Sequence, residues 1–236
     1  MVFSSSKRKK TFTNTDVFVE STAIAKVTNC KFLGVILDEN LSWRQHIDYT
    51  KKKISKVIGI LYRARPRLSS QHLVKLYNAL ILPYFYYCNF IWASANRSTL
   101  DTLVKTQKQA VRCISNISKR TSTGVYFTKL SILTIKEITF YSIALFMYKL
   151  HHDCHPPYFK TLFTENANIH THNTRQFNLL HPPSCKLNLS KTFIKYRGVL
   201  IWNTVVNKVD CNTKPSTFKS SVKSYIKRNQ HVISLI

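Results

Sequence analysis

Residues 151–155, His-His-Asp-Cys-His, concentrate side chains that can bind a metal ion, and Cys185 or His181 could complete a zinc site. Spacing this tight rarely lets every side chain converge on one ion. The alternative, which we favour, is a polar helix end whose histidines lie at the negative end of the helix dipole. A Cys-His nucleophile pair can also be drawn, but nothing marks one cysteine as activated. We therefore expect no metal-binding residue and no catalytic residue here.

Carboxylates are too few for a phosphoryl-transfer centre. Such a centre needs several carboxylates around two metal ions about 3.5–4 Å apart, and the chain has 10 Asp and Glu in total. Asp38 and Glu39 are adjacent, but an acidic pair after a strand favours a solvated turn. Glycine occurs four times, too sparsely for a phosphate-binding Walker loop or a dinucleotide fingerprint. These counts exclude NTP hydrolysis and Rossmann-type chemistry.

Positive charge dominates the composition. Lys and Arg total 36, the net charge is +26, and residues 49–136 contain 16 basic side chains and one acid, Asp101. We therefore expect a polyanionic partner. A solvated helix surface explains any single lysine more simply, but the near absence of acids favours phosphate contact for the set as a whole. The candidate nucleic-acid-binding residues, on two expected helices, are Lys52, Lys56, Arg63, Lys105, Lys108 and Arg112.

Residues 76–96 form an uncharged run that is long enough to span a membrane. Asn78, Pro83, Asn89 and four tyrosines interrupt it, so we expect a helical core and no membrane contact. Its aromatic side chains could stack on bases, although we expect most of them to pack in the core. These side chains are Tyr84, Phe85, Tyr86, Tyr87, Phe90 and Trp92.

The N-terminal residues and the cysteines indicate the compartment. The first ten residues have no apolar run and end in Lys7-Arg8-Lys9-Lys10, so we expect a nuclear or cytoplasmic protein that is not secreted. Four basic residues are a weak nuclear signal, and we favour a solvated turn. The six cysteines are scattered without a Cys-x-x-Cys pair, which favours buried reduced thiols over a disulfide framework.

Hydrophobic periodicity predicts strands and then helices. Strand-like patterns cover residues 17–19, 22–27 and 31–37 and predict a small antiparallel sheet. A long amphipathic helix follows, with a capping box at Ser42 and Gln45. Its apolar positions, spaced alternately by four and three residues, are Trp43, Ile47, Thr50, Ile54, Val57 and Leu61.

Four further helices follow in the pattern. One starts after Ser69-Ser70 and kinks near Pro83, and one starts at about Ser98. Another starts at a Thr134-x-x-Glu137 capping box and is broken over residues 151–157. Residues 164–190 lack a period, and we place the domain boundary there. An apolar segment over residues 193–206 precedes a last helix on Phe218, Val222, Tyr225 and Ile226, with Lys219, Lys223, Lys227 and Arg228 facing outward.

Several short runs resemble non-LTR (LINE-type, jockey-like) retrotransposon reverse transcriptases just after their catalytic palm. Together they extend over nearly the whole chain. The runs are Lys31-Phe32-Leu33-Gly34-Val35, Leu41-Ser42-Trp43, residues 76–83, Ile91-Trp92, residues 107–112, residues 132–137, Trp202-Asn203 and Phe218-Lys219.

This resemblance implies a role for each part of the chain. Phe32, Leu33 and Gly34 would lie in the hairpin that holds the primer end, the helices to about Ser115 would form the thumb, and the rest would be a C-terminal domain. Cys88 stands where the family commonly has glycine. The fingers, the palm aspartates and the endonuclease have no counterpart, so Met1 could mark a truncation.

The sequence thus predicts an α+β, mainly α fold. Residues 1–41 would be an end-of-palm, primer-grip-like β region, residues 42–160 a thumb-like helical region, residues 161–190 an irregular linker and residues 191–236 a C-terminal helical segment. We expect a C-terminal fragment of an RNA-directed DNA polymerase that binds primer and template and is inactive alone. The alternatives are a stand-alone basic nucleic-acid-binding protein or a non-functional pseudogene product.

The expected partners follow from the same resemblance. They are RNA, DNA or an RNA/DNA hybrid, together with the missing fingers and palm region. No cofactor is expected in this chain, whereas the intact polymerase would imply Mg²⁺.

Overall fold

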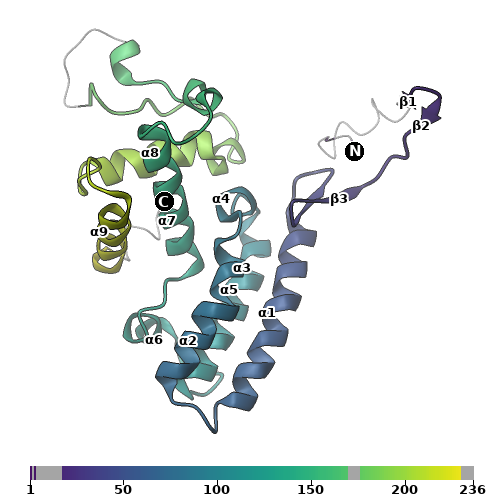
Figure 1. Ribbon diagram of the computed structural model, residues 1–236, viewed down its shortest axis with the longest axis vertical. Coiled ribbons are helices and arrows are strands. Elements are labelled where there is room, and N and C mark those ends of the chain that lie inside the picture. Colours follow the sequence, from purple (N-terminus) through teal and green to yellow (C-terminus); the bar gives the residue numbers. More distant parts are fainter. Residues whose placement is uncertain (2, 4–17, 170–175, 230–236) are drawn as a thin grey trace.

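The computed structural model describes residues 1, 3, 18–169 and 176–229. It is mainly helical with a small N-terminal β region (Figure 1), which confirms the predicted fold class. The strands are β1 (Phe18–Val19), β2 (Thr22–Ala23), β3 (Asn29–Phe32) and β4 (Val35–Asp38). The helices are α1 (Arg44–Ala64), α2 (Ser70–Leu80), α3 (Leu82–Tyr86), α4 (Asn89–Trp92), α5 (Arg97–Ser115), α6 (Gly124–Lys129), α7 (Ile135–His151), the 3-10 helices η2 (Pro157–Leu162), η3 (Asn166–Asn168) and η4 (Ser190–Thr192), α8 (Ile194–Val206) and α9 (Pro215–Arg228).

The β region consists of two antiparallel hairpins rather than one sheet. β1 pairs with β2, and β3 pairs with β4 so that Phe32 faces Val35. The single strand predicted over residues 31–37 is wrong because Leu33 and Gly34 form a two-residue turn, with φ of 45° and 82°. Two consecutive positive φ angles suit the right-handed twist of the flanking strands. Figure 1 shows the β1–β2 hairpin extending away from the helices.

A buried carboxylate fixes the entry into α1. Asp38 accepts hydrogen bonds from the backbone N–H groups of Asn40, Ser42 and Trp43 at 3.2, 3.0 and 2.9 Å. The residue before α1 is Trp43, which makes no capping hydrogen bond, and the Ser42 hydroxyl accepts from the Arg44 N–H, so the predicted capping box on Ser42 and Gln45 is wrong. The prediction that Asp38 lies in a solvated turn is also wrong, since the side chain is buried. It satisfies the N–H of Trp43, the residue before α1, and two N–H groups of the preceding turn.

A first core lies between α1, α2, α3 and α5. Ile47, Ile54 and Leu61 of α1 are fully buried as their spacing predicted, with Ile58 rather than Val57 between them. Val35 of β4 joins the same core. The predicted interruption near Pro83 is present, because α2 and α3 are separate helices on either side of Ile81. Neither α4 nor α6 was predicted.

Gln107 is a buried polar side chain in this core. Its Nε2 donates to the Tyr77 hydroxyl at 2.9 Å and to the Leu133 carbonyl at 2.8 Å, and its Oε1 accepts from the Ile135 N–H at 3.1 Å. One amide thereby joins α5 to α2 and to the start of α7. Burial raises the pKa of Tyr77, so its hydroxyl keeps its proton at physiological pH.

The helix α7 belongs to two cores. Its start carries the predicted capping box, in which Thr134 and Glu137 exchange hydrogen bonds. Ile138 closes the first core, and from Phe140 onward the helix contributes to a second core shared with α8 and α9. The boundary predicted at residues 161–190 stays a prediction. The described part of that segment packs on α8, where Leu180 and Asn203 exchange two hydrogen bonds.

Three further expectations concern single features. Among the described residues no helix is both long and apolar enough to cross a membrane. All six cysteines are free, but only Cys113 and Cys211 are buried and Cys154 is exposed, so the prediction of buried thiols holds for two. The Lys7-Arg8-Lys9-Lys10 run lies outside the described residues.

Replacing Gln107 by Leu should lower the free energy of unfolding by about 3 kcal/mol, because three buried polar groups would lose their partner. Gln109 lies two residues away on the exposed side of α5. The matched change Gln109→Leu should therefore stay within about 0.5 kcal/mol of the parent. Urea denaturation followed by circular dichroism measures both, and equal midpoints for the two variants would contradict this role for Gln107.

Candidate nucleic-acid interface

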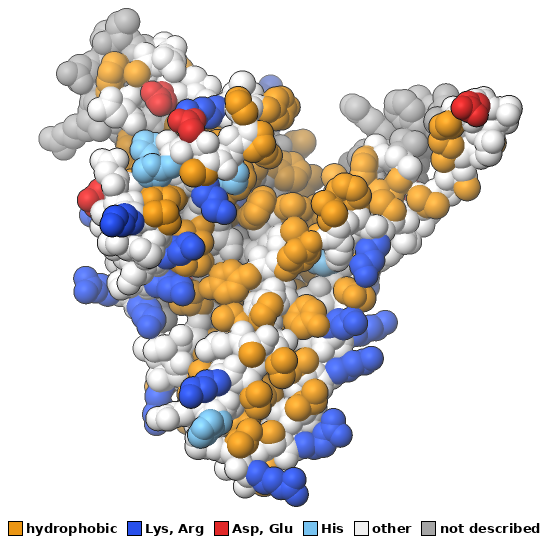
Figure 2. Space-filling view, in the orientation of Figure 1, with side chains coloured by type: hydrophobic (Ala, Val, Ile, Leu, Met, Phe, Trp, Pro, Cys, Tyr) orange, Lys and Arg blue, Asp and Glu red, His pale blue; other side chains and the backbone are white. Residues whose placement is uncertain are grey.

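The basic side chains predicted on α1 lie on its solvent side. Lys52, Lys56 and Arg63 are exposed and face away from the buried residues of the helix. Their separations of four and seven residues keep them on one side of the helix. In Figure 2, Lys and Arg side chains line the edge of the molecule along α1, and the acidic side chains of this view lie over the β1–β2 hairpin and the C-terminal region.

The basic side chains predicted on α5 divide into two kinds. Lys105 and Lys108 are exposed, and the exposed Asp101 lies one turn before Lys105. Arg112 is half-buried and donates through Nε and Nη2 to the Thr121 carbonyl at 3.4 and 3.3 Å. Arg112 therefore holds the loop after α5, whereas the two lysines extend into solvent.

The three primer-grip-like residues form the tip of the β3–β4 hairpin. Phe32 and Leu33 are 63% and 75% exposed, so both apolar side chains are open to a ligand. The Tyr87 hydroxyl donates to the Leu33 carbonyl. A Cβ added to Gly34 would lie 3.4 Å from Cε1 of the same ring. The tip is thus docked on Tyr87, at the junction of α3 and α4.

The residues around Tyr87 hold that ring in place. Cys88, the first residue after it, has a left-handed backbone with φ of 49°. The indole N–H of the fully buried Trp92 donates to the Tyr87 carbonyl at 2.8 Å. A buried side chain of the first core therefore fixes the residue on which the hairpin tip rests.

Most of the aromatic side chains predicted for the core are in it, which confirms that interpretation. Burial raises the pKa of Tyr86 to about 12, with a smaller contribution from Tyr141. Phe85 and Trp92 are fully buried, Tyr86 and Phe90 pack against the second core, and Tyr84 and Tyr87 are exposed. Two of the six predicted aromatic side chains are thus exposed and open to stacking on bases.

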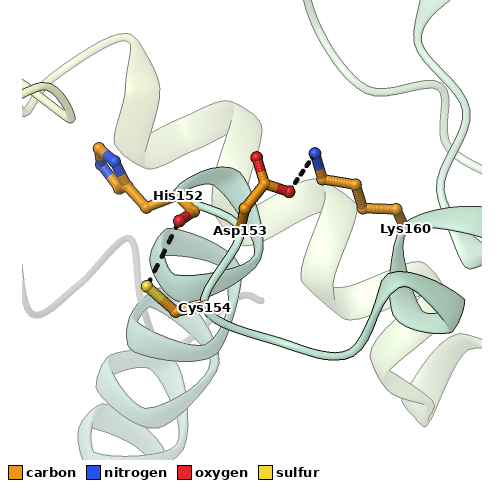
Figure 3. Close-up of polar contacts among 4 residues, drawn as sticks. All are labelled: His152, Asp153, Cys154 and Lys160. Atoms are coloured by element: carbon orange, nitrogen blue, oxygen red, sulfur yellow. Dashed lines mark hydrogen bonds and ion pairs between the residues drawn. The ribbon is translucent and has the colours of Figure 1, made fainter.

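The side chains near the end of α7 that were considered as metal ligands point in different directions (Figure 3). The ring of His152 lies with Nε2 2.9 Å from the Cys211 carbonyl, Asp153 pairs with Lys160, and the Cys154 thiol donates to the His152 carbonyl at 3.3 Å. Within the described ranges, no group of three or more His, Cys, Asp or Glu side chains could hold a metal ion.

Comparison with known proteins identifies a relative. The chain is 31% identical over 114 residues to the RNA-directed DNA polymerase from mobile element jockey of Drosophila funebris. The chain is related to a mobile-element reverse transcriptase. The alignment covers 44% of this chain and 12% of that polymerase, so the chain spans a small part of its relative. No family model matches the chain, and no solved structure matches it.

Changing Gly34 to Ala should loosen the hairpin tip. The left-handed backbone at this position costs a residue with a Cβ roughly 1–2 kcal/mol, whereas the new methyl group would only reach van der Waals contact with the Tyr87 ring. Gly59, inside α1 with no atom within 4 Å of an added Cβ, is the matched control. Gly59→Ala should instead stabilise the protein by about 0.5–1 kcal/mol.

Hydrogen exchange of the β3 and β4 amides is the sensitive measurement, because the strain is local. Gly34→Ala should speed exchange there, and Gly59→Ala should not. If Gly34→Ala left the exchange of both strands unchanged, the strain expected from the left-handed backbone of this turn would be contradicted.

Proposed function

We propose that this chain supplies the primer- and template-holding part of a mobile-element reverse transcriptase, corresponding to the end of the palm and the thumb. The observation that carries the proposal is the exposed basic side of α1, which follows directly after the β3–β4 hairpin in the chain. The similarity to the jockey polymerase supports the relation to a reverse transcriptase on which the proposal builds. We place this activity in the nucleus or the cytoplasm.

Phosphate contact explains the charge better than solubility does. A helix that presents lysines at successive turns can follow a phosphate backbone, and each neutralised phosphate releases condensed counterions. Lys52, Lys56 and Arg63 lie on an ordered helix whose opposite side is buried. They are therefore held in position before the nucleic acid arrives, which lowers the ordering cost of binding.

The described carboxylates support a non-catalytic role for the chain on its own. Asp38 is bound to three backbone N–H groups, Glu137 belongs to a capping box, and Asp153 pairs with Lys160. Carboxylates used in this way cannot also converge on two catalytic metal ions. In this proposal, Mg²⁺ is held by the palm of an intact polymerase and not by this chain.

The basic helix faces should dominate the salt dependence of binding. We expect affinity for a primer-template duplex to fall roughly 10³- to 10⁵-fold between 50 and 200 mM salt if about 6–10 phosphates are contacted. A first variant changes five exposed residues to Gln, namely Lys52, Lys56, Arg63, Lys105 and Lys108. It should flatten the slope of log affinity against log salt by about 0.9 for each phosphate that is no longer neutralised.

The control variant removes the same charge from exposed positions in the C-terminal region. Its five changes to Gln are at Lys195, Lys208, Lys219, Lys227 and Arg228. This variant should change the slope much less, because the proposed phosphate-binding residues remain. Fluorescence anisotropy across a salt series measures both, with circular dichroism as the folding check. Equal slopes for the two variants would show diffuse basicity and defeat the assignment.

The isolated chain should not extend a primer. With Mg²⁺ or Mn²⁺, an RNA template and all four dNTPs, incorporation should equal that of a reaction without protein, because the described carboxylates do not converge. A complete reverse transcriptase in the same assay is the positive control. Template-dependent extension by the isolated chain would contradict this part of the proposal.

A further inference from the structure

Two lysines from different elements lie over one aromatic ring. The Nζ atom of Lys31, on β3, is 5.3 Å from the ring centroid of Tyr49, and the Nζ atom of Lys53, on α1, is 5.5 Å from it. Both lysines are exposed and Tyr49 is half-buried. The β3–β4 hairpin and the first helix therefore each bring an ammonium group to the same ring.

This cluster lies between the two parts of the proposed interface. On α1, Lys52, Lys53 and Lys56 follow Tyr49 by three, four and seven residues, separations that place neighbours on one side of a helix. On β3, Lys31 is adjacent to Phe32 at the hairpin tip. Tyr49 therefore connects the basic side of α1 with the tip.

The ring holds the two cations without neutralising them. A cation over an aromatic face is attracted by the ring quadrupole, and the ammonium keeps its charge and its N–H donors. Two like charges held at one ring also repel each other, so phosphates that pair with them relieve the repulsion. The ring restricts both flexible side chains beforehand, which lowers the ordering cost when those phosphates bind.

We infer that Lys31, Tyr49 and Lys53 form a binding site for the phosphodiester backbone of a nucleic acid, where the strand passes from α1 to the β3–β4 hairpin. The inference rests on the proposed function and adds to it a site that joins two elements. Each ammonium is a compact, strongly hydrated charge that suits a phosphate oxygen. Successive phosphates along one strand provide one anion for each of the two ammonium groups at the ring.

The test compares two double variants of the full chain. Lys31→Gln with Lys53→Gln removes both cations from the ring. Lys51→Gln with Lys75→Gln is the control, because it removes the same charge from two other exposed lysines, on α1 and α2. On one primer-template duplex, the first pair should flatten the slope of log affinity against log salt by about 1.8, that is about 0.9 for each of two phosphates, and the control pair should change it much less.

Variants of Tyr49 test whether the ring positions the two lysines, because they leave the charge of the chain unchanged. Tyr49→Phe keeps the aromatic face and should bind like the parent chain. Tyr49→Leu keeps an apolar side chain but releases both lysines, so affinity should fall several-fold at unchanged net charge. If Tyr49→Leu bound as tightly as Tyr49→Phe, with circular dichroism spectra like the parent's, the ring would have no positioning role and the site as stated would be overturned.

The remaining outcomes distinguish this site from the proposed function. If the five-residue variant of α1 and α5 showed a flattened salt slope while the Lys31/Lys53 pair matched its control, the site would be rejected and the proposed function would stand. If the parent chain did not bind the duplex at all, both would be rejected. Vesicles containing phosphatidylserine are the second ligand. A loss of vesicle binding with unchanged duplex binding would assign the lysines to a membrane surface and overturn the site.

Discussion

The amide of Gln107 is the contact on which the two halves of the molecule depend. It joins α5 to the Tyr77 hydroxyl of α2 and to the backbone at the start of α7. Because α7 then continues from the first core into the second, the position of its first turn determines where α8 and α9 can pack. A buried amide with three partners is specific in a way that apolar contacts are not, since any shift in register would leave polar groups unpaired.

Two of the described carboxylates bind backbone N–H groups rather than neutralising lysines. Asp38 closes the turn between β4 and α1, and Glu137 closes the capping box of α7. Because residues 49–136 contain a single acid, Asp101, the exposed lysines of α1 and α5 have little negative charge nearby and repel one another. That repulsion weakens the folded state, and a bound polyanion would offset it by binding the folded form preferentially. The positive charge that destabilises the free folded chain thus favours the binding of a polyanion.

Local patterns predicted much of the fold, and long-range contacts account for the rest. The helices α1, α5 and α7 were predictable because apolar spacing and a capping box are visible in a short window, and the exposure of Lys52 follows from the same spacing. The strand pattern missed the β3–β4 turn because Leu33 is not a residue that usually adopts positive φ, whereas the family resemblance had implied a hairpin at Phe32, Leu33 and Gly34. The role of Asp38 was missed because its partners are backbone N–H groups. The division into two cores could not be predicted from the sequence because α7 is apolar on nearly every side. The contact of Arg112 with the Thr121 carbonyl could not be predicted because it depends on the path of a loop.

The position of the hairpin is coupled to the bundle through buried side chains. The Ile36 N–H donates to Nδ1 of the buried His46 at 3.4 Å, and the His46 ring lies 6.3 Å from that of Trp92. Burial lowers the pKa of His46, so the neutral ring that accepts this hydrogen bond is favoured at physiological pH. Trp92 in turn holds the carbonyl of Tyr87, on which the tip rests. β4 and the hairpin tip are therefore both held by residues that contact the Trp92 indole, and the tip is presented from a rigid support although the hairpin has only two strands.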